Sequence, residues 1–244
     1  MTVRFASVAH KPIILLNAAT ATLLLYLLFR NWILSTGNFP SGADSIPGLV
    51  RLVYHQRYGW LTVWNSYLYL GHLDWFESYS FENFILAFLV AVLGDPLRVF
   101  KIYPLALTVL SLLTSYSLVF WLTRSHLASM TSSLVYGFSP PSVFFNLTHG
   151  QFIPYQLPYA AFPLIVLLWD VYLRGKSRIA APLAAFFTGA FLIGVTPPAM
   201  PYVQFIFGSV LLAWIVLRVA HSDRKARLAL MCLLIFSLSF VLSL

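Results

Sequence analysis

Seven long apolar runs constrain this chain more than any other feature of its sequence. They lie at residues 13–34, 102–122, 127–146, 155–173, 179–196, 200–219 and 228–244. A helix rises about 1.5 Å per residue, so a run of about 20 apolar residues crosses the ~30 Å hydrocarbon core of a bilayer. Backbone N–H and C=O groups in lipid need partners within their own segment, so each run is predicted to be α-helical.

The composition agrees with this interpretation. Hydrophobic residues make up 60% of the chain and charged residues 9%, and the mean hydropathy is +0.83. Such a chain has too few polar side chains to cover a soluble fold. The predicted fold class is an all-α integral membrane protein with about seven transmembrane helices. Residues 1–244 form one membrane domain, with residues 35–101 as an external loop subdomain. The last run reaches Leu244 with no polar tail, so we expect a truncated chain.

Basic residues indicate the orientation of these helices. The segment Phe81–Gly94 has an apolar part of only about 10 residues, which reaches ~15 Å and suggests a helix lying at the membrane interface. With that assignment, ten basic and two acidic residues lie inside, whereas five of each lie outside. An excess of Lys and Arg marks cytoplasmic loops. The sequence therefore predicts a multi-pass protein of the cell membrane, with its amino terminus cytoplasmic and its first long loop external.

The excess of Lys and Arg over Asp and Glu indicates which molecules the protein is expected to bind. A sequence pI near 9.7 that arises from short cytoplasmic loops points to anionic lipid, and we expect no nucleic-acid partner. The lipid bilayer and other membrane proteins are the expected macromolecular surroundings. The single cysteine, Cys232, lies in an apolar run and is interpreted as a core residue.

Five of the seven carboxylates lie in the long external loop, which is where chemistry is expected in so apolar a chain. Asp44 belongs to the Gly42-x-Asp44 corner just after the first apolar run. Asp44 is interpreted either as a helix cap or as a reactive carboxylate. The loop is also rich in aromatic residues such as Trp64, which are typical of a membrane interface or of a platform for a sugar ring.

The order of these parts resembles the amino-terminal module of the GT-C superfamily, the multi-spanning glycosyltransferases that use polyprenyl-phosphate sugars, including YfhO-like and related archaeal proteins. The shared parts are an anchor helix, Gly42-x-Asp44, a short helix ending near residues 57–59, a Trp-rich stretch, the interfacial helix and Lys101. The resemblance covers nearly the whole chain in topology. It implies an enzyme that moves a sugar from a polyprenyl-phosphate donor to a hydroxyl acceptor at the outer membrane face.

The resemblance also implies roles for individual residues. Asp44 corresponds to the acidic residue of the first external loop, which acts as a catalytic base or a metal ligand. His149 would complete a site for a divalent metal ion with Asp44. The resemblance places Lys101, Arg98 and Glu77 at substrate-binding positions. The chemistry of the transfer adds Arg51 and His149, because cations stabilise the departing phosphate, and Trp64 is added as a platform for the sugar ring. The turn at 146–151 lacks the acidic residue that several GT-C families carry there.

Two other functions stay open at this stage. The chain is alternatively a non-catalytic GT-C-like subunit or a scaffold that binds lipid-linked glycans. A transporter would carry ionisable groups near the bilayer midplane, where the apolar runs have almost none. Asp170, four residues before Arg174 at a predicted cytoplasmic end, is predicted to form an i,i+4 ion pair instead of a proton relay.

Overall fold

The computed structural model describes residues 11–34, 53, 64–65, 72–73, 81–139, 156–175, 179–188 and 201–220, and they are almost all helical. The all-α fold class is therefore confirmed for this part of the chain. The helices are α2 (Lys11–Leu34), α5 (Phe81–Leu93), α6 (Pro96–Thr123), α7 (His126–Gly137), α9 (Gln156–Leu173), α10 (Ala180–Thr188) and α11 (Pro201–Ala220). In the loop that the sequence predicts to be external, β1 (Trp64–Asn65) pairs antiparallel with β2 (His72–Leu73).

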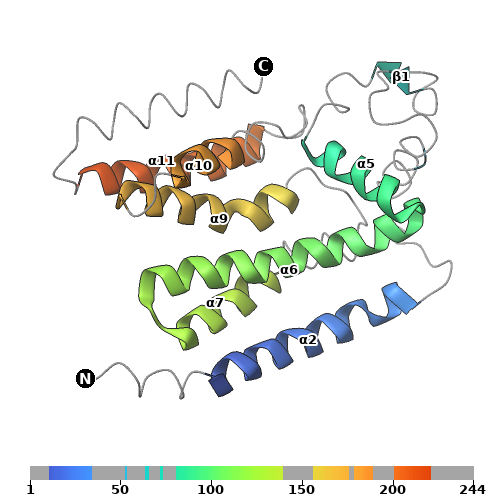
Figure 1. Ribbon diagram of the computed structural model, residues 1–244, viewed down its shortest axis with the longest axis horizontal. Helices are drawn as coiled ribbons and strands as arrows, with labels where there is room; N and C mark the ends of the chain where they lie inside the picture. Colours follow the sequence, from blue (N-terminus) through green and yellow to red (C-terminus); the bar gives the residue numbers. More distant parts are fainter. Residues whose placement is uncertain are drawn as a thin grey trace.

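The long helix α6 is the centre of the bundle (Figure 1). It packs against α7 on one side and α9 on the other, while α9 also contacts α10 and α11. Helix α2 packs on α6 and α7, and α5 folds back onto α6 through Gly94. Gly94 adopts φ +68, a left-handed conformation that suits glycine at a sharp corner.

The start of α6 shows a signal that hydropathy missed. The helix begins at Pro96, six residues before the predicted run, because Asp95 caps it: the Leu97 N–H donates to Asp95 Oδ1 at 2.9 Å. Proline at the first helical position loses no hydrogen bond, so Asp-Pro is a strong start signal. Asp95, one of the five carboxylates of the predicted external loop, thus has a structural role.

The end of α7 corrects a predicted boundary. The sequence predicted a run through residue 146, but α7 ends at Gly137 after 12 residues. Proline restricts the residue before it and lacks an N–H, so Ser139-Pro140-Pro141 stops the helix. Twelve residues reach about 18 Å, which is too short to cross a bilayer.

Among the described helices, α6 is long and apolar enough to cross a membrane. Shorter apolar helical segments lie at Ala18–Arg30, Leu157–Leu173 and Gly208–Ala220. The predicted run at 228–244 and the second half of the run at 179–196 lie outside the described residues. The arrangement as seven membrane spans stays a prediction.

Small and hydroxyl side chains fill much of the interior. On α7, Ser129, Ser133 and Gly137 are buried at a spacing of four residues against α6. A Cβ at Gly137 would lie 2.5 Å from Leu112 Cδ2, so the two backbones approach closely there. Between α6 and α9, the Thr114 hydroxyl donates to the Ala160 carbonyl at 2.7 Å. Small residues and interhelical hydroxyl bonds are characteristic of helix packing in membranes.

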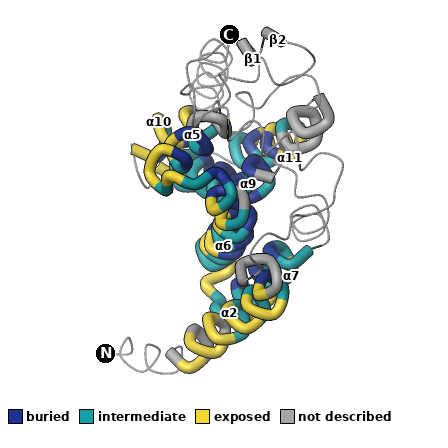
Figure 2. Tube along the Cα trace, turned by 90° about the vertical axis from the view of Figure 1, so that its right-hand side faces the viewer, coloured by how far each residue is buried: buried dark blue, intermediate teal, exposed yellow. Residues whose placement is uncertain are grey.

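Large apolar residues, in contrast, are exposed on α2, α5, α6, α7, α10 and α11, and Figure 2 shows exposed positions along these helices. The exposed ones include Leu23 on α2, Phe88 on α5, Leu113 on α6, Val135 on α7 and Val216 on α11. Soluble monomers rarely expose contiguous apolar surface on this scale. A buried core still joins α5, α6, α9, α10 and α11, and its members include Leu86, Val99, Ile165, Trp169, Ala184 and Leu211.

Candidate functional site

The predicted external site lies mainly outside the described residues. Asp44, Arg51, Glu77 and His149 belong to segments that the structure does not describe, so their predicted roles and the divalent metal site stay predictions. Among the described residues no group of three or more His, Cys, Asp and Glu could hold a metal ion. The backbone of Trp64 lies in β1, opposite Leu73.

Two of the predicted substrate-binding residues are placed. Arg98 and Lys101 lie three residues apart in the first turns of α6 and therefore share one side of the helix. Lys101 is half-buried. Arg98 is exposed, and its Nε lies 3.4 Å from Asp95 Oδ2. The Asp95 carboxylate therefore both caps α6 and partly neutralises one of the two cations predicted to face the phosphate.

A second polar site is found at the opposite end of α6, and its centre is Asp170. This carboxylate on α9 is fully buried, with 0% exposure. Its Oδ2 accepts from Trp121 Nε1 of α6 at 2.7 Å and lies 2.5 Å from Arg174 Nε. Its Oδ1 lies 2.8 Å from Arg218 Nε of α11, a close ion pair without an aligned hydrogen bond.

The predicted Asp170–Arg174 pair is thus confirmed, and the structure adds two partners from other helices. An isolated carboxylate is costly to bury, so a buried one needs partners of opposite charge and hydrogen bonds. Here the partners come from three helices that meet at their carboxyl-terminal ends. We call Trp121, Arg124, Asp170, Arg174 and Arg218 the Asp170 cluster.

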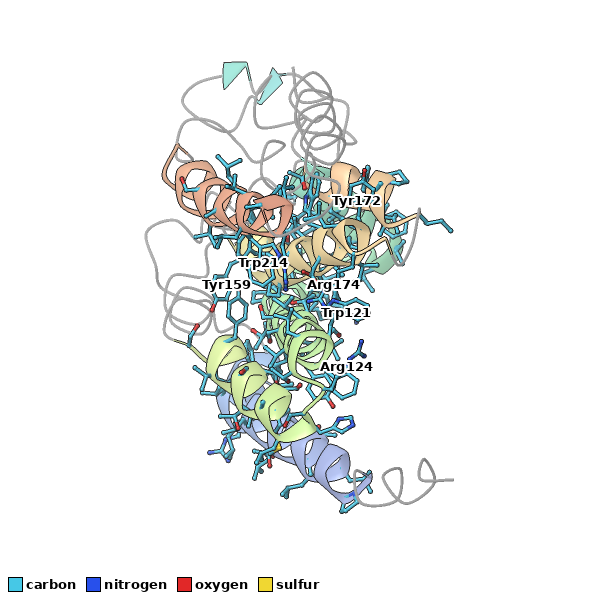
Figure 3. All side chains as sticks on the ribbon, turned by 90° about the vertical axis from the view of Figure 1, so that its left-hand side faces the viewer. Trp121, Arg124, Tyr159, Tyr172, Arg174 and Trp214 are labelled. Carbon is cyan, nitrogen blue, oxygen red and sulfur yellow. The ribbon has the colours of Figure 1, made fainter. Side chains whose placement is uncertain are left out.

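Aromatic rings complete the cluster (Figure 3). The Arg124 guanidinium lies 4.7 Å from the centroid of the Trp121 ring, and that of Arg174 lies 5.9 Å from it. The Arg218 guanidinium lies 4.7 Å from the Trp214 ring centroid. Cations over indole faces are held in a fixed orientation while remaining partly open to solvent. Arg174 and Arg218 keep 41% and 36% of their side chains exposed.

The two sites differ in what they can do chemically. Asp170 is neutralised and shielded from solvent, which suits it for holding three helices together and not for accepting protons from a substrate. The start of α6 carries Lys101 and Arg98, and the acid–base chemistry predicted with them stays a prediction, because its carboxylate Asp44 lies outside the described residues. The sequence analysis did not predict Trp121 and Arg218 as partners of Asp170. The available signal was that Asp170 and Arg218 were both assigned to the predicted cytoplasmic side.

Comparison with protein-family models, curated proteins and solved structures finds no match for this chain.

Proposed function

We propose that this protein is a membrane glycosyltransferase of the GT-C type. In this proposal it transfers a sugar from a polyprenyl-phosphate donor to a hydroxyl acceptor at the outer face of the membrane. Asp44 is the base, and Lys101, Arg98, Arg51 and His149 supply positive charge or, for His149 with Asp44, a metal site. Trp64 and Glu77 contact the sugar.

The observation that carries the proposal is the exposure of large apolar side chains on the described helices, together with buried serine and threonine at helix contacts. Both features favour a lipid environment. A water-soluble bundle would cover its outer faces with polar side chains instead. A lipid environment suits a donor whose polyprenyl chain stays in the bilayer while its sugar phosphate reaches the interface.

The geometry at the start of α6 agrees with this proposal. The chain turns sharply at Gly94 between α5 and α6, and Arg98 and Lys101 follow within two turns of that corner. In the predicted topology this corner lies at the outer interface, at the level of a donor phosphate. Two cations there would stabilise negative charge on a leaving phosphate.

The proposed reaction balances as a simple displacement at the sugar. Asp44 takes the proton of the acceptor hydroxyl while the oxygen of that hydroxyl forms a bond to the anomeric carbon of the sugar. The bond from that carbon to the phosphate oxygen breaks, and polyprenyl phosphate leaves with the electron pair. No redox partner is required.

A non-catalytic subunit or glycan-binding scaffold is the second candidate. One observation favours it: the Arg98 guanidinium is already engaged by Asp95, which reduces the charge available to a phosphate. A transporter is disfavoured, because Asp170 is the buried charged residue among those described and it lies near a helix end, paired with two arginines.

Replacement of Asp44 tests the proposal. The full chain, reconstituted in vesicles with a panel of polyprenyl-phosphate hexoses, should release polyprenyl phosphate, and Asp44→Asn should slow that release by about 100-fold or more. Asp223→Asn is the matched control, because it removes a carboxylate on the predicted cytoplasmic side, away from the proposed site, and we expect its rate to stay within about twofold of wild type.

Two outcomes would contradict the assignment. If the wild-type protein releases polyprenyl phosphate and Asp44→Asn does so equally fast, Asp44 is not the base. If the wild-type protein binds the panel without turnover, and Asp44→Asn binds it equally well, the scaffold function replaces the enzyme.

A further inference from the structure

Two tyrosines hold the end of α7 against the start of α9. The Tyr136 hydroxyl donates to the Tyr159 carbonyl at 2.7 Å, and the Tyr159 hydroxyl donates to the Tyr136 carbonyl at 2.9 Å. Their rings are stacked, with centroids 4.3 Å apart and an angle of 3° between the ring planes. Each side chain thus bonds to the backbone of the other residue, and we call this reciprocal pair the tyrosine clasp.

Prolines explain why both carbonyls accept side-chain hydroxyls. In an α-helix the carbonyl of residue i accepts from the N–H of residue i+4. Residue i+4 is Pro140 for Tyr136 and Pro163 for Tyr159, and proline has no N–H. The spacing Tyr-x-x-x-Pro therefore occurs twice, and at each copy the other tyrosine takes the place of the missing helical donor. Backbone carbonyls in a protein interior need donors, and the clasp supplies one to each helix.

Neighbouring hydroxyl groups extend the contact. Ser139 Oγ lies 2.7 Å from the Tyr159 hydroxyl oxygen and 3.0 Å from the Tyr136 carbonyl oxygen, so it bridges the two tyrosines. The next carbonyl of α9, that of Ala160, accepts from the Thr114 hydroxyl of α6 at 2.7 Å. The clasp therefore lies at the level of the middle of α6.

The clasp closes the chain between α7 and α9 into a loop. Tyr136 and Tyr159 are 23 residues apart in the sequence and are bonded to each other, and the segment 140–155 lies between them. If the clasp opened, the two ends of this segment could separate, and the segment would gain conformational entropy. The closed clasp therefore limits the conformations that the segment can adopt.

We propose that Tyr136 and Tyr159 are positioning residues, which hold the segment 140–155 in the conformation that binds the sugar donor. The clasp itself rests on the contacts described above. The link to the donor rests on the proposed function, in which His149 of this segment meets the donor phosphate. In this proposal the tyrosines act through the backbone at the base of the segment and not by contact with the donor.

Limited proteolysis of the detergent-solubilised full chain tests the clasp without an assay of activity. Chymotrypsin cleaves after aromatic residues, and the segment contains Phe144, Phe145, Phe152 and Tyr155. Tyr136→Phe keeps the aromatic ring and removes the hydroxyl. Cleavage within the segment should become about fivefold faster, because it follows the population of the open state and one lost hydrogen bond raises that population by about this factor. Tyr159→Phe should have the same effect.

Thr114→Val is the matched control. It removes another interhelical hydroxyl bond to α9, at the neighbouring carbonyl, and valine keeps the shape of the side chain. Thr114 belongs to α6 and does not close the segment, so cleavage within residues 140–155 should stay within about twofold of wild type. The clasp is overturned if both phenylalanine variants are cleaved at the wild-type rate, or if Thr114→Val is cleaved as fast as they are.

Donor binding separates a positioning role from a purely structural one. A polyprenyl-phosphate hexose at ten times its Kd should slow cleavage of the segment about tenfold in the wild type and in Thr114→Val, because it binds the closed state. In the double variant Tyr136→Phe/Tyr159→Phe, KM for the donor should rise at least about threefold while kcat stays within about twofold, since only the closed segment binds the donor.

The positioning role is overturned if a bound donor fails to slow cleavage, or if the double variant keeps the wild-type KM. Asp44→Asn should leave both the cleavage rate and its slowing by the donor unchanged, because Asp44 is assigned to the chemical step. Failure of the clasp and failure of the catalytic assignment are therefore distinguishable.

Discussion

At the scale of single residues, Asp170 has the most unusual environment in the described part of the chain. A carboxylate with no exposed surface is held by one indole N–H and two guanidinium groups, which come from its own helix and from two others. The spacing to Arg174 predicted one of these partners. Trp121 and Arg218 lie 49 and 48 residues away along the chain, so only the packing of α6 and α11 on α9 brings them to the carboxylate.

Asp170→Asn should lower the free energy of unfolding by about 2 kcal/mol. The variant loses charge-assisted bonds, but Arg174 and Arg218 are partly exposed and regain some hydration, which keeps the cost below that of a fully buried orphan charge. Detergent-solubilised protein followed by thermal or denaturant unfolding provides the measurement.

A double-mutant cycle distinguishes loss of the ion pair from a general loss of packing. In a double-mutant cycle with Arg218→Gln, we expect a coupling energy of about 1–2 kcal/mol between the two positions. A coupling near zero would mean that the Asp170–Arg218 contact contributes nothing to stability. Asp95→Asn, which removes an exposed carboxylate, should change stability by less than about 0.5 kcal/mol.

At the scale of helices, the contact between α6 and α7 depends on the absence of a side chain. Gly137 is buried against Leu112, and neighbouring Ser129 and Ser133 keep the rest of that face small. The sequence predicted an apolar helix here, and it did contain a stripe of small residues at a spacing of four. It did not show which helix the stripe would contact, because hydropathy carries no information about partners.

Gly137→Ala should destabilise the protein by about 1–3 kcal/mol, although alanine is the better helix former. Its Cβ would lie 2.5 Å from Leu112 Cδ2, so Leu112 must leave its position or the helices must separate. Adding Leu112→Ala to Gly137→Ala should remove most of this extra cost. Denaturant unfolding of the wild type, the two single variants and the double variant measures this coupling.

Gly208→Ala on α11 is the control for this effect. A Cβ at Gly208 meets nothing within 4 Å, so the substitution should be neutral or stabilise by up to about 1 kcal/mol through helix propensity. If both glycine variants gain stability, close approach of α6 and α7 is not a constraint on the fold.

At the scale of the whole molecule, the described helices expose many large apolar side chains while they also bury an apolar core. Leucine, valine and phenylalanine lie outward on α2, α5, α6, α7 and α11, whereas serine, threonine, alanine and glycine occupy helix contacts. The charges lie toward the two ends of α6, with Arg98 and Lys101 at one and the Asp170 cluster at the other. The charges are therefore separated by most of the length of α6, and the predicted membrane topology stays a prediction.

Leu113→Arg tests the lipid environment directly. Leu113 lies in the middle of α6 with 61% of its surface exposed. An arginine at the centre of a membrane span costs about 2.5–3.5 kcal/mol on insertion scales, so the membrane-integrated fraction should fall sharply. On a water-facing helix surface the same change would be within about 0.5 kcal/mol of neutral. Membrane fractionation of the variant beside the wild-type protein provides the measurement.

Much of the fold and little of the candidate site could be predicted from the sequence. The helix at 81–93 and the limits of the helices at 11–34, 156–173 and 201–220 follow from continuous apolar runs, since such runs need internal hydrogen bonding. The start of α6 at Pro96 and the end of α7 at Gly137 were missed, because capping and proline effects act locally and leave hydropathy unchanged. Of the predicted site residues, Arg98 and Lys101 share one side of α6, while Asp44 and His149 lie outside the described residues.

The sequence by itself determined that this chain forms apolar helices, and it placed the basic residues near the helix ends or in the segments between the helices. Burial of backbone polar groups demands the first, and the cost of moving charge into hydrocarbon demands the second. Only the tertiary structure decided that α6, α9 and α11 meet at Asp170 and that α6 and α7 meet at Gly137. These contacts depend on shape and on pairing between distant residues, which a linear pattern of hydropathy and charge does not encode.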